Sequence, residues 1–345
     1  MTSRLGLWLV LVITTAIYAP VFTAPFVYED ANWTADLAPS HRPARFAVPG
    51  RGLTQWTYQV QSDVSLRSGT FHGVNVGLHL LAGTALYMVL SALVGGTSAP
   101  LAGVAVFLWH PLNSQAVAYV SARADLLVAL GVVGAIWGVL HRRTLAGLVA
   151  LVSGLSMAVL SKEIGLIAFP VVALAWATSR PRVPWRGLTA LAVTAAGVGW
   201  WLAWYAQWFT WRALIAYSAR MATTSGRLDE AALQATAFWR WVRLFVVPVG
   251  FTIDPDPWSV PAVWRLVALG ALAVVAGGVG AWWLRCRSWA AFGALVVGVS
   301  ILPRFLWSTG EGMQEHHAYL PMVGVACLVA VLVHRLGPGA LEGAL

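Results

Sequence analysis

Long runs of apolar residues recur along the whole chain and are separated by short polar connectors. An apolar stretch of about 18 residues or more indicates a helix that crosses a membrane. The runs predict ten helices, near residues 5–22, 73–94, 100–118, 125–140, 144–160, 164–178, 187–205, 261–283, 288–303 and 318–334. The pattern therefore predicts an all-α, polytopic integral membrane protein with about ten transmembrane helices.

Composition supports this class and removes others. Of the 345 residues, 59% are hydrophobic and 10% are charged, whereas a soluble domain carries about a quarter charged residues. With a mean hydropathy of +0.72, the chain is neither a soluble globular protein nor a disordered one. Cys286 and Cys327 lie too far apart to predict a disulfide scaffold or a metal site. The basic residues form no stripe on a soluble face, so the net charge of +9 does not indicate nucleic-acid binding.

Arginines in the short connectors predict the orientation, because cytoplasmic connectors of membrane proteins are enriched in Arg and Lys. If the N-terminus is cytoplasmic, that side of the membrane holds nine arginines and one acid, Glu342. The arginines are Arg4, Arg142, Arg143, Arg180, Arg182, Arg186, Arg285, Arg287 and Arg335. Both termini are then cytoplasmic. The first apolar run imitates a signal peptide, but it lacks a clean cleavage site and predicts a retained helix.

The opposite, extracytoplasmic side holds twelve of the thirteen carboxylates. Two external segments, 23–72 and 206–260, are long enough to fold locally, and they predict amphipathic helices at the membrane interface. The cytoplasmic connectors leave no room for a nucleotide-binding domain, and no glycine-rich phosphate-binding motif is present. The sequence therefore predicts a single transmembrane domain, residues 1–345, without a soluble C-terminal domain. Any chemistry is expected outside the cytoplasm, on a substrate that arrives through the membrane.

Five groups of polar residues interrupt the apolar pattern. Glu29 and Asp30 directly follow the first predicted helix. A carboxylate near the membrane surface suits a general base for a hydroxyl nucleophile, and a solvated loop pair is the alternative. His72, Asn75 and His79 share one helical face that enters the membrane. Such residues either face a cavity or form hydrogen bonds between helices, and the sequence leaves both open.

The third group includes His110, which with the following proline breaks the third apolar run. It also includes Arg123 and Asp125, which open the next predicted helix. These two residues could simply pair with each other. Alternatively, Arg123 binds a phosphate, since the planar guanidinium matches phosphate oxygens.

The fourth group contains the only lysine of the chain, Lys162, next to Glu163. A lysine at a membrane edge often extends its ammonium to water, but here it is an equally good phosphate partner. In the fifth group, Glu315, His316 and Tyr319 open the last predicted helix. A glutamate at a helix start is favoured for structural reasons alone.

The order of these groups is more informative than any one of them. The segments FVYED, RGLTQWTY, FHGVNVGLH, HPLNSQAVAYVSARADLL, LSKEIGLIAFP, RLFVVPVGFTID and EHHAYLP resemble the transmembrane O-mannosyltransferase family. That family is best known from members with a C-terminal tetratricopeptide array and belongs to the C-type (GT-C) glycosyltransferases. The resemblance runs from about residue 26 to residue 321, and its RADLL and SKE blocks are the most specific.

The resemblance implies a GT-C-like fold and transfer of a sugar, mannose being one candidate. The donor is a polyprenyl-phosphate-linked sugar, the acceptor is a hydroxyl group, and the reaction inverts the anomeric carbon. Glu29 and Asp30 match the acidic pair that supplies the catalytic base, with Asp30 slightly favoured. Arg123 and Lys162 are the expected partners of the leaving phosphate, and Arg51 is a weaker candidate. The further substrate-binding candidates are His72, Asn75, His79, His110, Asp125, Glu163, Glu315, His316 and Tyr319.

No metal, nucleotide or other cofactor is implied. Departures from the family pattern are Glu29, Gly52, Gln115 and His317, and the tetratricopeptide array is absent. The acceptor is therefore open between a protein Ser or Thr, a glycan and a lipid. Two alternative functions remain: a transporter or flippase of polyprenyl-linked glycans, and a catalytically degenerate scaffold subunit. A transporter would need polar residues through the depth of the bilayer. The expected location is a cell membrane, the bacterial inner membrane in particular.

Overall fold

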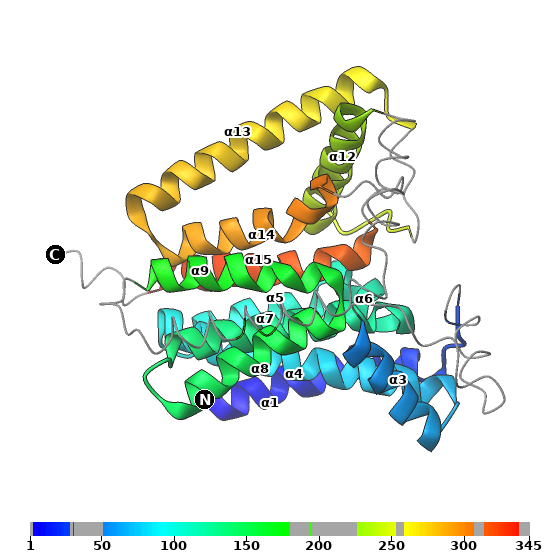
Figure 1. The fold of residues 1–345 in the computed structure, drawn as a ribbon. Coiled ribbons are helices and arrows are strands. Elements are labelled where there is room, and N and C mark those ends of the chain that lie inside the picture. The colour runs from blue at the N-terminus through cyan, green and yellow to red at the C-terminus, as the bar shows by residue number, and fades with distance from the viewer. Residues whose placement is uncertain are drawn as a thin grey trace.

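The computed structural model describes residues 3–27, 30, 51–179, 194, 197, 226–252, 259–306 and 314–337 (Figure 1). Within these ranges all regular elements are helices and no strand occurs. In chain order they are α1 (Ser3–Ile17), η1 (Ala19–Thr23), α3 (Gly52–Val64), α4 (Ser68–Val94), α5 (Ser98–Trp109), η3 (Pro111–Asn113), α6 (Ser114–Ala118), η4 (Val120–Ala122), α7 (Arg123–Leu140), α8 (Leu145–Ser161), η5 (Glu163–Ile167), α9 (Ala168–Thr178), α12 (Arg227–Val246), α13 (Ala262–Cys286), α14 (Trp289–Leu306), η7 (Glu315–Ala318) and α15 (Tyr319–Leu336), where η marks a 3₁₀ helix.

The predicted apolar segments overlap these helices, except that segment 187–205 lies outside the described residues apart from residues 194 and 197. Four stretches are long and apolar enough to cross a membrane: Ser68–Val94, Val120–Leu140, Ala262–Cys286 and Glu315–Leu336. Other apolar helices of 10–17 residues accompany them. A full crossing takes about 20 residues, so these lengths favour a membrane protein, and the count of ten spans stays a prediction.

Local sequence explains where several helices begin and end. Thr144 caps α8, because its hydroxyl accepts a hydrogen bond from the Gly147 N–H at 3.0 Å. Gly95 ends α4 with a φ of +67°, a conformation that glycine adopts without steric cost. The residue before a proline avoids the helical conformation, so α5 ends at Trp109 and His110 is extended before Pro111. The predicted break in the third apolar run is confirmed.

Glycines allow the closest helix contacts in the bundle. A Cβ on Gly131 of α7 would lie 2.6 Å from the carbonyl oxygen of Gly154 on α8, and the reverse contact would be 2.5 Å. Gly293 of α14 and Gly324 of α15 form an equivalent pair. Small residues let helix backbones approach closely within a membrane, where the hydrophobic effect does not drive helices together. These two crossings therefore bring together the elements that carry the polar residues described below.

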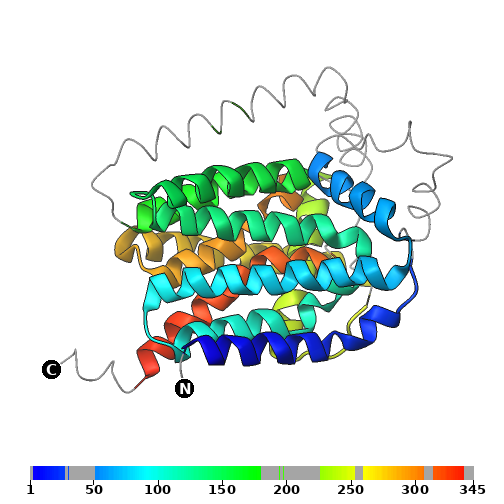
Figure 2. The same ribbon diagram turned by 90° about the horizontal axis from the view of Figure 1, so that it is seen from below.

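The bundle has two different ends (Figures 1 and 2). The start of α1, the α7–α8 and α13–α14 connections and the end of α15 lie at one end, while α3, α6 and α12 lie at the other. The first end carries the described arginines predicted to share one side, and Arg180, Arg182 and Arg186 lie outside the described residues. The shared end agrees with the predicted topology, while the side of the membrane stays a prediction.

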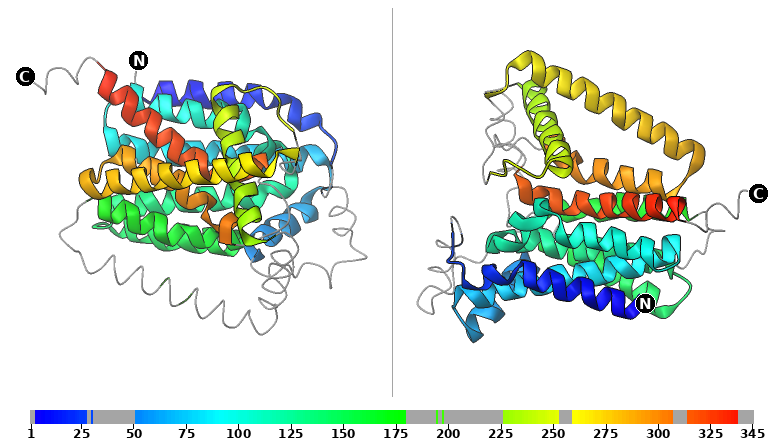
Figure 3. Two further views of the ribbon diagram at one scale, coloured as in Figure 1. Left: turned by 90° about the horizontal axis from the view of Figure 1, so that it is seen from above. Right: turned by 180° about the vertical axis from the view of Figure 1, so that it is seen from behind.

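The two predicted external segments each supply a helix to the second end. Within segment 23–72 this is α3, and within segment 206–260 it is α12. The face of α12 with Phe238, Trp241 and Leu244 packs into the core of the bundle. By contrast, α13 lies on the outside with no buried residue (Figure 3). An apolar helix this exposed is expected to contact lipid.

Candidate functional site

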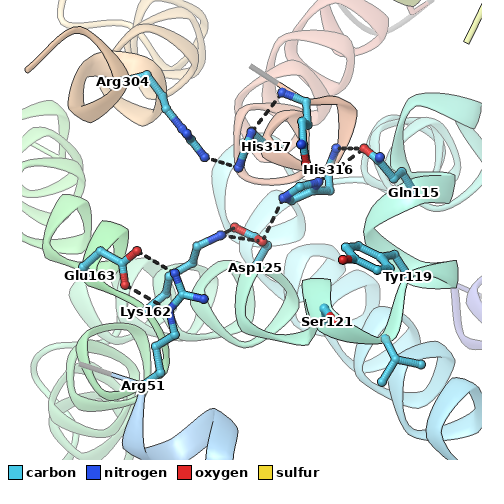
Figure 4. Close-up of polar contacts among 12 residues, drawn as sticks. Arg51, Gln115, Tyr119, Ser121, Asp125, Lys162, Glu163, Arg304, His316 and His317 are labelled. Atoms are coloured by element: carbon cyan, nitrogen blue, oxygen red, sulfur yellow. Dashed lines mark hydrogen bonds and ion pairs between the residues drawn. The ribbon is translucent and has the colours of Figure 1, made fainter. Parts of the chain in front are cut away.

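The polar residues that interrupt the apolar pattern gather at the α3–α6–α12 end of the bundle (Figure 4). At the centre, the Lys162 ammonium lies 2.9 Å from both carboxylate oxygens of Asp125. Asp125 is in the first turn of α7, where the helix dipole favours an acid, and Lys162 follows α8. Burial lowers the pKa of the Lys162 ammonium, and the charge of Asp125 opposes that effect. Lys162 and Asp125 therefore pair across two helices.

His316 extends this pair toward the last helix. Its imidazole Nε2 lies 4.0 Å from an Asp125 oxygen. Its backbone N–H donates to the Gln115 side-chain oxygen at 2.6 Å, so η7 is fixed to α6. The Tyr119 ring lies 6.2 Å from the imidazole, centroid to centroid. Figure 4 shows these side chains pointing toward a common region beside Asp125.

Two more cations border the pair. Arg51, which precedes α3, forms a two-pronged contact with Glu163 at 3.1 and 2.8 Å. On α14, Arg304 donates a hydrogen bond to His317. We call Arg51, Asp125, Lys162, Glu163 and Arg304 the charge cluster. It contains three basic and two acidic side chains. The cluster therefore places three cationic side chains around the buried Asp125 carboxylate, and cations of this kind are typical partners of a phosphate group.

Asp30 is held by η4, which directly precedes α7, the helix that carries Asp125. Its carboxylate accepts hydrogen bonds from the Val120 N–H at 3.1 Å, the Ser121 N–H at 2.8 Å and the Ser121 hydroxyl at 2.5 Å. Ser121 lies in η4, four residues before Asp125 in the first turn of α7. Burial raises the pKa of the Asp30 carboxyl, while the bonds from Ser121 and Val120 and the nearby His72 act in the opposite direction. The other predicted acid, Glu29, lies outside the described residues.

Arg123, a predicted phosphate ligand, has a different environment. It is fully buried, and its Nε donates to the Asn75 side-chain oxygen at 2.9 Å while Nη2 donates to the Phe71 carbonyl at 3.2 Å. The guanidinium lies over the Tyr58 ring at 4.3 Å. Contacts of this kind hold α3, α4 and α7 together. We interpret Arg123 as a brace for the bundle end rather than a phosphate ligand.

The amide of Asn75 and the hydroxyl of Tyr58 complete this brace. Asn75 donates to the carbonyls of Val117 and Tyr119, at 3.3 and 3.2 Å. The Tyr58 hydroxyl donates to the Val120 carbonyl at 2.6 Å. Both fix the short α6–η4 segment, which includes Ser121, the residue whose N–H and hydroxyl hold Asp30. They therefore position the segment that holds Asp30.

His79 and Tyr319 are packed in the core. The His79 Nε2 lies 3.1 Å from the Leu108 carbonyl, which can only accept, so Nε2 carries the hydrogen. Nδ1 is then an acceptor, and the Tyr319 hydroxyl donates to it at 2.7 Å. Both residues are fully buried with their polar atoms paired. Their geometry is that of interhelical hydrogen bonding, the structural alternative that the sequence left open.

Removing the Tyr319 hydroxyl should destabilise the bundle. In Tyr319→Phe the buried Nδ1 of His79 loses its donor, which costs about 1–3 kcal/mol. We expect a lower thermal unfolding midpoint for the detergent-solubilised protein. Tyr87→Phe, on the same helix as His79 but partly exposed, is the control and should unfold like the wild type. An unchanged midpoint in Tyr319→Phe would show that the hydroxyl does not bond to His79.

His110 and Glu315 both fasten α12 to the rest of the bundle. The His110 Nδ1 accepts from the Leu112 N–H, so its Nε2 carries the hydrogen and donates to the Phe245 carbonyl at 3.0 Å. Glu315 accepts hydrogen bonds from the Arg240 guanidinium at 2.9 Å and from the Thr252 N–H at 2.8 Å. These two predicted site residues are therefore anchors for the end of the bundle.

Of the three predicted residues on α4, His72 alone lacks a partner. Its residue is 1% exposed, and neither ring nitrogen has a hydrogen-bond partner among the described residues. Two residues at this end, Ser121 and Arg304, are not among the predicted site residues. Arg304 ends an apolar run much as Lys162 does, so the same rule could have found it. Ser121 offered no signal, because its role depends on the distant Asp30.

Among the described residues, no group of three or more His, Cys, Asp or Glu side chains could hold a metal ion. The candidate site consists of the charge cluster, the hydrogen-bonded carboxylate of Asp30 and the imidazole of His72. No protein-family model matches the chain, and neither a curated protein nor a solved structure is significantly similar to it.

Proposed function

We propose that the protein is a membrane glycosyltransferase that takes its sugar from a polyprenyl-phosphate donor. The observation that carries the proposal is the charge cluster around Asp125 at the start of α7, together with the buried Asp30 carboxylate that the preceding η4 holds. Lys162 and Arg304 offer donors for a phosphate, and Asp30 offers a base. The motif order that resembles the transmembrane O-mannosyltransferases, and through them the GT-C fold, supports the same reaction class.

The proposed reaction is a single displacement at the anomeric carbon. The acceptor oxygen forms a bond to this carbon from the side opposite the phosphate, and its proton goes to the base. The bond between the carbon and the phosphate oxygen breaks, and both its electrons leave with polyprenyl phosphate. The configuration is therefore inverted. The leaving phosphate gains a negative charge, which the cations of the charge cluster stabilise as it develops.

Two alternatives have less support. A transporter needs polar residues along a path through the bilayer, whereas the described polar residues of the site gather at one end of the bundle. A catalytically degenerate scaffold is favoured by one observation, the three hydrogen bonds that the Asp30 carboxylate accepts. Such bonds would suit an acid that only anchors η4. Donor turnover separates the scaffold from the enzyme.

The deciding experiment uses purified full-length protein in lipid vesicles with radiolabelled polyprenyl-phosphate-mannose or -glucose. A Ser/Thr-containing peptide, an oligosaccharide and a glycolipid serve as acceptors. We expect one donor to yield a glycosylated acceptor, or at least free sugar and polyprenyl phosphate. A sugar nucleotide is the negative control. If neither donor is transferred or hydrolysed, the proposal fails.

A further inference from the structure

His72 is a buried imidazole whose two ring nitrogens have no hydrogen-bond partner in the described part of the chain. Burying a polar group without a partner costs free energy, and folded proteins contain few such groups. On the same helix, Asn75 and His79 differ from His72, because each of their side-chain polar atoms has a hydrogen-bond partner. The unpaired nitrogens of His72 therefore indicate a position at which a ligand supplies the missing hydrogen bonds.

The surroundings of His72 place that ligand beside Asp30. Val120, whose N–H donates to the Asp30 carboxylate, packs in one cluster with Phe71 and Phe26, which border His72. The Phe26 ring lies 6.4 Å from the imidazole, centroid to centroid, and packs edge-on against Phe71. Aromatic rings cannot satisfy the imidazole nitrogens as a hydroxyl or amide would. The position thus combines one carboxylate, one imidazole and an apolar wall.

We propose that His72 binds the hydroxyl group of the acceptor and positions it toward Asp30. This inference rests on the proposed function. A neutral imidazole has one donor and one acceptor nitrogen, which is the pattern a hydroxyl group matches. A donor phosphate offers only acceptor oxygens, and the charge cluster supplies its partners. His72 is therefore a positioning residue for an alcohol, whether from a sugar or from a Ser or Thr side chain.

The test measures how the donor sugar is divided between water and an alcohol. The full-length protein is given radiolabelled polyprenyl-phosphate-mannose, with octyl mannoside as a defined alcohol at several concentrations. His72→Phe keeps a ring of similar size without hydrogen-bonding atoms. We expect transfer to octyl mannoside to fall about ten-fold or more, with a raised KM for that alcohol. Hydrolysis of the donor should stay within about two-fold of the wild type, because water needs no such positioning.

Folding is tested separately. His72→Phe removes an unpartnered polar group, so its thermal unfolding midpoint should equal or exceed that of the wild type. His72→Asn and His72→Gln place an amide near the former Nδ1 and Nε2 positions, and one of them should retain more transfer than His72→Phe. Ser91→Ala removes another unpartnered polar atom at the far end of α4. It should leave the ratio of transfer to hydrolysis unchanged.

Each outcome decides the proposal. A fall in transfer with hydrolysis preserved and amide rescue supports it. Equal loss of transfer and hydrolysis, unchanged transfer, or equal loss in all three His72 variants overturns it. A wild type that hydrolyses the donor without glycosylating octyl mannoside also overturns the His72 assignment, while the proposed donor chemistry stands. A wild type that does neither overturns the proposed function itself.

Discussion

Replacing Lys162 by methionine is expected to lower sugar transfer by about 100-fold or more. Methionine keeps the length and the apolar part of the side chain but removes the ammonium. The leaving phosphate then loses the buried cation of the charge cluster at the moment its charge increases, and one such electrostatic contact is worth about 10²–10³ in rate. The measurement is the turnover of polyprenyl-phosphate donor by purified protein at saturating donor.

The same change also affects folding, which needs its own control. Without Lys162 the buried Asp125 has lost its close partner, and breaking such a pair costs about 3–5 kcal/mol. The double variant Lys162→Met/Asp125→Asn removes the unpaired charge and should recover most of the unfolding midpoint without recovering transfer. If the double variant regains transfer as well, Lys162 acts only through stability.

The charge cluster contains a second, more exposed ion pair, Arg51–Glu163, with which the buried Lys162–Asp125 pair can be compared. The side chains of Arg51 and Glu163 are 36% and 43% exposed, against 10% and 7% for Lys162 and Asp125. An exposed ion pair contributes about 1 kcal/mol or less. The depth of burial, rather than the number of ion pairs, therefore explains why Lys162 is the position with the large expected effect.

The helices could be predicted from the sequence because their signal is local. Apolar runs, Pro111 and Gly95 identify the ends of α4 and α5 without any knowledge of neighbours. The gathering of basic connectors at one end also followed from sequence, since orientation depends on where Arg residues lie along the chain. The pairing of Lys162 with Asp125 did not follow, because 37 residues separate them and periodicity carries no information on such contacts.

The roles of individual site residues were less predictable for the same reason. The type of residue suggested that Arg123 binds phosphate, but its partners Asn75 and Phe71 lie on another helix and occupy the guanidinium. For His72, Asn75 and His79 only the tertiary contacts distinguish the residues, because Asn75 and His79 have hydrogen-bond partners and His72 has none in the described part of the chain. A residue's type gives its chemistry, whereas its accessibility depends on tertiary packing.

Replacing Asp30 by asparagine is expected to lower transfer by about 100-fold or more, since loss of a general base costs about 10²–10⁴ in rate. Glu29→Gln, the matched change at the neighbouring acid, should lower it by less than about ten-fold if Asp30 is the base. Both variants are compared as donor turnover by purified protein. Asparagine provides one acceptor oxygen where the carboxylate provides two, so one of the bonds to Val120 or Ser121 is lost at a cost of about 1–3 kcal/mol.

The pH dependence separates the chemical role of Asp30 from this structural one. A base must be deprotonated, and burial raises the pKa of Asp30 above the ordinary value of 3.8. Transfer by the wild type should therefore be full above this raised pKa and fall as the pH decreases through it, at a higher pH than for an ordinary aspartate. Glu29→Gln should keep the same acid limb, because the group that titrates is still present. If Glu29→Gln instead abolishes transfer while Asp30→Asn only lowers the unfolding midpoint, Glu29 is the base and Asp30 anchors η4.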